Sequence, residues 1–128
     1  MDDLAGGHGA EEEGVRENAD AAPEGDHLLK VLAALSNPHR LRIIASLVRE
    51  RNYVSRLARE TGISRPLLHM HLQRLEAAGL VVGSLELSAE GKAMRFYEVT
   101  AFVYQLSPES IAGAVATLSP AVQREETQ

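Results

Sequence analysis

Residues 63–81 read ISRPLLHMHLQRLEAAGLV, and this stretch decides the fold. Ser64 is a suitable N-cap for a helix, Pro66 is tolerated in its first turn, and Gly79 marks its end. Between these limits the leucines recur at the spacing of one helix face, which predicts a buried stripe formed by Leu68, Leu72 and Leu75.

A shorter helix is expected just before it. Residues 56–61 read RLARET, Ser55 can cap them, and Gly62 ends them because glycine adopts the left-handed C-terminal conformation without strain. Two short helices joined through a glycine, with Ile63 tucked between them, are typical of a helix-turn-helix.

A β-hairpin is expected directly after this pair. Residues 81–100 read VVGSLELSAEGKAMRFYEVT, and two segments rich in β-forming residues flank 88–92, where Glu90 and Gly91 supply turn chemistry. A hairpin in this position is a wing. The predicted fold class is therefore mostly α with a β-hairpin wing, a winged helix-turn-helix.

Two further helices are expected before the motif. Asp26 can cap the first, whose apolar positions are Leu28, Val31, Leu32 and Leu35. Asn37 caps the second and Pro38 opens it. This helix runs to about Glu50, with an inward face predicted as Leu41, Ile44, Ala45 and Val48.

A last helix is expected after Ser107, which caps it, with Pro108 in its first position. Its apolar residues Ile111, Val115 and Leu118 face one way. So small a domain leaves this face little to pack against, so a partner subunit is expected there.

Composition excludes several classes of protein. The chain has no cysteine, which excludes disulfides, thiolate metal sites and cysteine nucleophiles. Its start resembles no signal peptide, and its apolar runs are shorter than the roughly 20 residues of a membrane span. No catalytic triad, carboxylate pair or phosphate loop is recognisable. We expect a cytoplasmic protein that is not an enzyme.

Charge is distributed unevenly along the chain. The net charge is −5, but residues 1–26 carry −8 and residues 27–107 carry +5. Because binding follows the local field, the total does not exclude a nucleic-acid partner. We interpret 1–26 as a disordered acidic tail, 27–118 as the domain and 119–128 as a flexible C-terminus. The tail is either a solubilising extension or a competitor of DNA on the basic face.

Together, ALSNPHRLRIIASL, VSRLARETGISRPLLHMHLQRLEAAGLV and GKAMRFYEVT resemble the ArsR/SmtB family of winged helix-turn-helix regulators over about residues 27–105. His71 and Leu72 occupy the family's His-Leu position, and residues 78–81 match its AGLV ending. The resemblance implies a sequence-specific DNA-binding transcriptional regulator, a repressor or an activator, that acts as a homodimer joined through its first and last helices. The interface residues expected from it are Leu28, Leu32, Ile111, Val115 and Leu118.

Members of this family often sense metals. Their two thiol positions fall on Tyr53 and Ser55 here, and the last helix offers Glu109 without a histidine. Neither common metal site is therefore carried over, and no cofactor is required for the fold. A metal-responsive regulator with a non-standard nickel or zinc site is an alternative, with His8 and His27 as weak candidate ligands.

The exposed side of the 63–79 helix carries the predicted base contacts. Arg65 can bind a guanine edge in a bidentate manner, and Gln73 can pair with adenine. Three further side chains are predicted to contact bases or phosphate there: Ser64, His69 and Met70. His71, one turn from the leucine stripe, is expected to be packed and partly buried.

Phosphate contacts are predicted outside this helix at Arg40, Arg56, Lys92 and Arg95. Three acidic residues of the hairpin weaken its field: Glu86, Glu90 and Glu98. A rival hypothesis is a winged-helix module for protein–protein contact, because Leu67 and Met70 lie near the exposed face. The predicted partners are double-stranded DNA, a second copy of the chain and a second regulatory protein.

Overall fold

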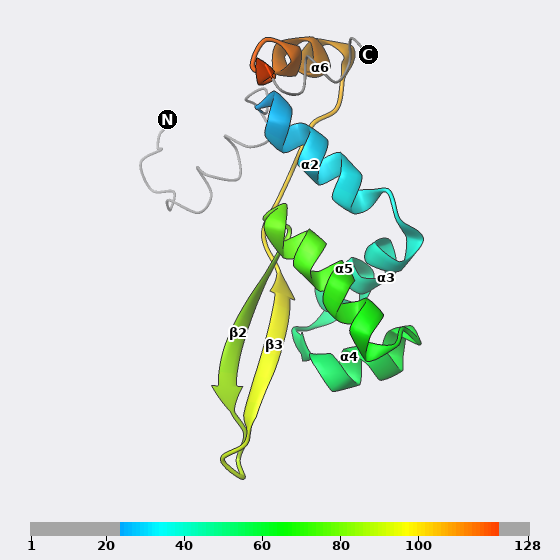
Figure 1. The fold of residues 1–128 in the computed structure, drawn as a ribbon, viewed down its shortest axis with the longest axis vertical. Helices are drawn as coiled ribbons and strands as arrows, with labels where there is room; N and C mark the ends of the chain where they lie inside the picture. The colour runs from blue at the N-terminus through cyan, green and yellow to red at the C-terminus, as the bar shows by residue number, and fades with distance from the viewer. Residues whose placement is uncertain (1–23, 121–128) are drawn as a thin grey trace, which may run out of the picture. The chain divides into compact units, whose positions relative to one another are not determined.

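A computed structural model describes residues 24–120 of the chain (Figure 1). These residues fall into two compact units, which are described separately. One unit is Lys30–Thr100, and the other contains the described residues on either side of it, 24–29 and 101–120. The predicted tail up to residue 23, His8 and the end of the chain from 121 lie outside the described residues.

The helix-turn-helix is present as predicted. Its helices are α4 (Val54–Thr61) and α5 (Arg65–Ala77), preceded by α2 (Gly25–Leu35) and α3 (Pro38–Arg49). Gly62 ends α4 with φ of 73°, and Gly79 follows α5 with φ of 78°, so both glycines hold the left-handed conformation. The Asn37 carboxamide accepts from the N–H groups of His39 and Arg40, as expected of an N-cap.

The leucine stripe of α5 forms the centre of the core. Leu68, Leu72 and Leu75 are completely buried, as are Leu57 of α4 and Leu80 beyond α5. Burying a leucine side chain contributes about 1.5–3 kcal/mol, so this cluster dominates the stability of the unit. It also fixes which side of α5 remains exposed.

The predicted inward face of α3 is wrong by about one residue. The buried residues are Arg40, Ile43, Ser46 and Leu47, while Leu41 and Val48 are 52% and 66% exposed. The segment LRIIASLV is apolar on more than one side, so its periodicity fits two registers. Because Arg40 is charged, the sequence favoured the register in which Arg40 is exposed, and this register is wrong.

Two helix starts also differ from expectation. α2 begins at Gly25, so Asp26 lies in its first turn, and the carboxylate accepts from the Ser119 N–H instead of capping. α4 begins at Val54, so Ser55 lies inside the helix and Tyr53 precedes it without a side-chain cap. Tyr53 is extended because it belongs to a strand.

The wing is a β-hairpin of β2 (Val81–Leu87) and β3 (Ala93–Val99), and Figure 1 shows it extending away from helices α3–α5. A short strand β1 (Asn52–Tyr53) pairs with Tyr97 and Phe96, giving an antiparallel sheet in the order β1-β3-β2. The strand between α3 and α4 thus joins the middle of β3 to the helix-turn-helix.

The second unit contains α6 (Pro108–Val115) and the start of α2. Ser107 and Ser110 form a reciprocal capping box at the start of α6, which confirms the predicted cap. The N–H of Gly25 donates to Thr117 Oγ1 at 2.7 Å. A Cβ at Gly25 would lie 2.3 Å from the Ala114 carbonyl oxygen, so only glycine fits there. Within 24–120, no helix is long and apolar enough to span a membrane.

Candidate nucleic-acid interface

The exposed face of α5 carries the side chains predicted to contact DNA. Ser64, Arg65, His69 and Gln73 are exposed, and Met70 is 38% exposed. The Ser64 hydroxyl forms no cap hydrogen bond, and the first-turn N–H groups of a helix have no intrahelical partner. The start of α5 therefore presents free donors beside the Arg65 guanidinium.

A groove brings this helix start together with the wing. Arg65 lines it together with Lys92 and Arg95, and its volume is about 300 Å³. The remaining lining residues are Tyr53, Val54, Ser55, Ala93 and Met94. None of these eight described residues is acidic, so the groove concentrates positive charge from segments about 30 residues apart in the sequence. We call it the α5–wing groove.

One of the hairpin acids is neutralised by a contact that the sequence did not reveal. Arg51 donates to both carboxylate oxygens of Glu86, with Nη1 to Oε2 at 2.6 Å, and its guanidinium lies 4.4 Å above the centre of the Phe96 ring. The hydrogen bond from Arg51 lowers the pKa of the Glu86 carboxyl. The expected weakening of the wing's field therefore does not come from Glu86.

Arg95 is held in place on the wing by its neighbour. Its Nε donates to the Tyr97 hydroxyl at 3.0 Å, and Tyr97 is only 4% exposed. The Tyr97 ring crosses Gly83 of the paired strand, where a Cβ would lie 2.8 Å from the ring. Gly83 therefore makes room for the side chain that positions Arg95.

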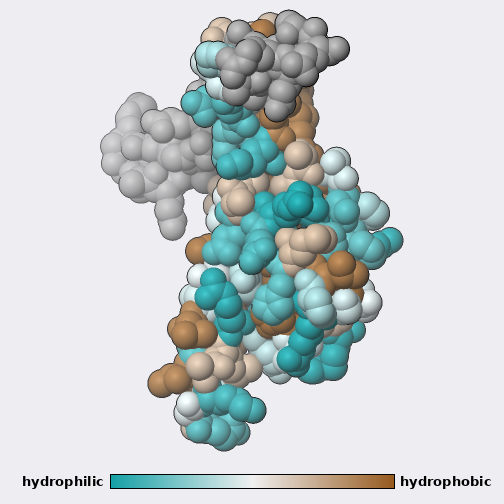
Figure 2. All heavy atoms as spheres, in the orientation of Figure 1, coloured by the Kyte–Doolittle hydropathy of each residue, from teal (hydrophilic) through white to brown (hydrophobic). Residues whose placement is uncertain are grey.

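The rest of the hairpin surface carries both apolar and polar side chains. Val82, Leu85 and Leu87 of β2 are exposed, and Figure 2 shows apolar side chains above a hydrophilic hairpin tip. Lys92 belongs to this tip, where the Ser88 hydroxyl also bonds Glu90. The cations of the wing are thus Lys92 at the tip, where Glu90 also lies, and Arg95.

Arg40 is not the phosphate contact that was predicted. Its side chain is 8% exposed, and its Nε donates to Nδ1 of His71 at 3.1 Å. Nη1 donates to the carbonyl oxygens of Ala33 and Ala34. The guanidinium is therefore engaged in hydrogen bonds within the protein. His71 is buried, as expected.

Arg56, another predicted phosphate contact, forms two ion pairs within the protein. Its Nε lies 3.2 Å from Glu60 and its Nη1 lies 3.3 Å from Glu50. It does not line the α5–wing groove. The two carboxylates offset part of its charge, and its contact with phosphate stays a prediction.

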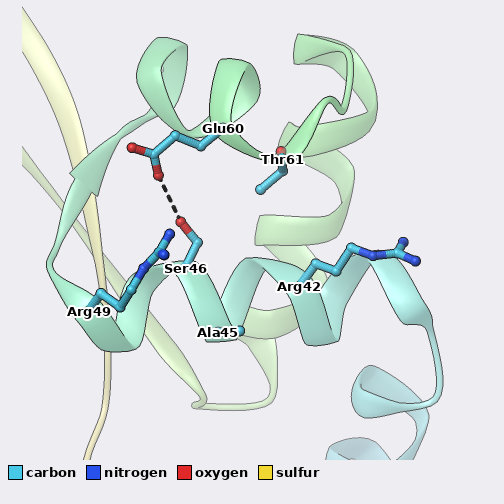
Figure 3. Close-up of a pocket in the computed structure, with 6 residues that line it drawn as sticks. All are labelled: Arg42, Ala45, Ser46, Arg49, Glu60 and Thr61. Carbon is cyan, nitrogen blue, oxygen red and sulfur yellow. Dashed lines mark hydrogen bonds between the residues drawn. The ribbon is translucent and has the colours of Figure 1, made fainter.

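A second groove, of about 470 Å³, lies between α3 and α4 (Figure 3). Arg42 and Arg49 stand at its opposite ends. The Ser46 hydroxyl donates to Glu60 across it at 3.0 Å, and Glu60 also accepts from Asn52 and Arg56. Because a carboxylate lies inside this groove, it lacks the one-sided charge of the α5–wing groove.

The predicted interface residues, all of them aliphatic, divide into two groups. Leu28 is 5% exposed, so it belongs to the interior of the protomer, and its neighbour Leu29 is exposed instead. Leu32, Ile111 and Val115 are exposed, while Leu118 is half-buried. Leu28 was misplaced because both leucines fit an apolar helix face equally well.

Metal sensing stays a prediction. Among the residues that the structure describes, no three His, Cys, Asp or Glu side chains gather into a ligand set. His27 Nε2 is hydrogen-bonded to the Tyr104 hydroxyl at 2.8 Å, and His8 lies outside the described residues.

Comparisons with known proteins bear on the family and the fold of the chain. Residues 37–82 match the model of the bacterial regulatory protein, arsR family. An HTH-type transcriptional regulator of Methanocaldococcus jannaschii is 36% identical over 84 residues, which are 66% of this chain and 87% of that protein.

Two solved structures share the fold. A "possible transcriptional regulatory protein" fragment of Mycobacterium bovis is 25% identical with a TM-score of 0.52, covering 80% of this chain and 94% of that one. Reduced HlyU of Vibrio cholerae is 25% identical with a TM-score of 0.51, covering 71% and 84%. The chain belongs to the ArsR family of bacterial regulatory proteins, which are winged helix-turn-helix transcriptional regulators and not enzymes.

Proposed function

We propose that the protein regulates transcription by binding double-stranded DNA in a sequence-specific manner as a homodimer. The α5–wing groove carries this proposal, because Arg65, Lys92 and Arg95 line it and none of its lining residues is acidic. Cations grouped in this way release counterions from the phosphate backbone and supply most of the affinity.

Base recognition is assigned to the exposed face of α5. A recognition helix enters the major groove with its N-terminal residues against base edges. Arg65 suits guanine, Gln73 suits adenine, and Met70 suits a thymine methyl group. His69 lies on the same exposed face and supplies a further donor.

The apolar surface of α6 supports the homodimer. Ile111 and Val115 lie one helical turn apart and are 48% and 55% exposed, and Leu32 of α2 is also exposed. Covering such side chains stabilises association by the hydrophobic effect. Two copies would place two recognition helices about one turn of DNA apart. In the cell the protein would act in the cytoplasm, at the nucleoid.

A gel-shift titration tests the proposal, using DNA from upstream of the protein's own gene and unrelated DNA of equal length. The Arg65→Gln/Lys92→Gln double variant should lose at least tenfold in affinity for the upstream DNA. The control is Arg42→Gln/Arg49→Gln, which removes the same charge from the α3–α4 groove and should bind like the wild type. Equal losses in both variants would contradict the proposed interface, and a chelator arm checks for a metal requirement.

A further inference from the structure

A small cavity between α2, α3 and α5 has no role in the proposed DNA contacts. Its volume is about 200 Å³, and it lies entirely within the Lys30–Thr100 unit. Three cationic and three alanine side chains line it, and no acidic one does: Lys30, Ala33, Ala34, Arg40, Arg74 and Ala77.

Arg40 reaches this cavity as a buried cation without an acidic partner. Its side chain bonds only neutral groups, the His71 ring and the carbonyls of Ala33 and Ala34. Those carbonyls lie in the last turn of α2, so the helix dipole offsets part of the charge. Nη2 makes no hydrogen bond to any described residue. Burying a cation is costly unless it is paired, so the site is electrostatically incomplete.

The surroundings of Arg40 add positive charge. Neither Lys30 nor Arg74 forms an ion pair within residues 24–120. Burial, followed by the charges of Arg40, His39 and Arg74, lowers the pKa of His71. Two of these three groups, Arg40 and Arg74, are permanently cationic.

We propose that this cavity binds a small carboxylate with a short apolar chain. The Arg40 guanidinium can hold a carboxylate through Nη2, while Lys30 and Arg74 add charge. The alanine side chains suit a hydrocarbon chain. At about 30 Å³ per water, the volume equals roughly seven water molecules, enough for a molecule the size of butyrate.

The ligand would touch the recognition helix through Arg74 and Ala77 of α5. Any effect on DNA affinity rests on the proposed function. Binding of the carboxylate itself does not, and it can be measured without DNA.

Thermal unfolding of the full chain with sodium butyrate tests this, with sodium chloride at equal ionic strength as the reference. A ligand that binds only the folded state should raise Tm by roughly 5 °C at ten times its Kd. Lys30→Gln/Arg74→Gln should abolish this rise. Arg42→Gln/Arg49→Gln, with the same charge change outside the cavity, should keep it.

Amide NMR shifts provide a second readout and should change first at Ala33, Ala34 and Ala77. An equal rise in Tm for all three proteins would show a general salt effect and overturn the site. No rise in the wild type would overturn it as well. Stabilisation by inorganic phosphate but not by butyrate would overturn the carboxylate assignment.

Discussion

The Nε of Arg40 donates to Nδ1 of His71 at 3.1 Å, and both side chains are buried. This contact joins α3 to the recognition helix α5. Since Nδ1 accepts, the imidazole must be neutral, with its proton on Nε2. A second proton on the ring would face the guanidinium directly.

We therefore predict that the protein loses stability in mild acid. Burial and the adjacent cations lower the pKa of His71 in the folded state, below its usual value of 6.5. Below pH 6.5 the unfolded chain then binds more protons than the folded one, so the free energy of unfolding decreases as the pH is lowered. Well above pH 6.5 both states are neutral at this site, and its contribution no longer changes with pH.

Urea unfolding of wild type and His71→Gln at pH 7.5 and pH 5.5 measures this. Glutamine retains an acceptor for Arg40 but does not titrate, so the variant should lose less stability than the wild type between the two pH values. His69→Gln, on the exposed side of the same helix, is the control and should behave like the wild type. Identical pH dependence in all three proteins would exclude His71 as the source.

The local elements could be predicted from the sequence because their signals are local. The stripe of Leu68, Leu72 and Leu75 and the glycines at 62 and 79 defined the helix-turn-helix, and Glu90-Gly91 marked the hairpin turn. These features depend on spacing and on backbone conformation, both of which the sequence states directly.

Contacts between distant residues could not be predicted in this way. Arg51 meets Glu86 across 35 positions, and Arg40 meets His71 across 31. Nothing in the local pattern distinguishes the buried Arg40 from an exposed arginine such as Arg65. Arg40 was therefore assigned to DNA although the fold buries it.

Gly83→Ala should disturb the wing more than an ordinary glycine substitution in a strand. The added methyl group would lie 2.8 Å from the Tyr97 ring, which is buried and cannot move away cheaply. We expect a loss of about 1–3 kcal/mol in the free energy of unfolding. Weaker DNA binding should accompany it, because Arg95 loses its support. Ser84→Ala, at an exposed position of the same strand, is the control; an equal loss there would remove the steric explanation.

Substitutions of Lys92 and of Gln73 should have different kinds of effect on DNA binding. Lys92→Gln removes a predicted phosphate contact, so it should weaken binding to all sequences alike and reduce the log–log salt slope by about 0.9. Gln73→Ala should relax the preference at one base pair by about 1–3 kcal/mol. Gel shifts on a set of single-base operator variants at several salt concentrations measure both effects. Unchanged relative affinities for Gln73→Ala would refute its base-reading role.

Ile111→Glu and Val115→Glu should separate the proposed homodimer into monomers. Both side chains are about half exposed on α6, so a charge there costs the protomer little, while an interface would have to bury it unpaired. Sedimentation equilibrium should give about twice the mass of 13.9 kDa for the wild type and the single mass for each variant. Leu87→Glu places the same charge on the more exposed wing and should leave the dimer intact. A monomer mass for the wild type at micromolar concentration would contradict the proposed dimer. A dimer mass for both variants would show that the interface does not include this face of α6.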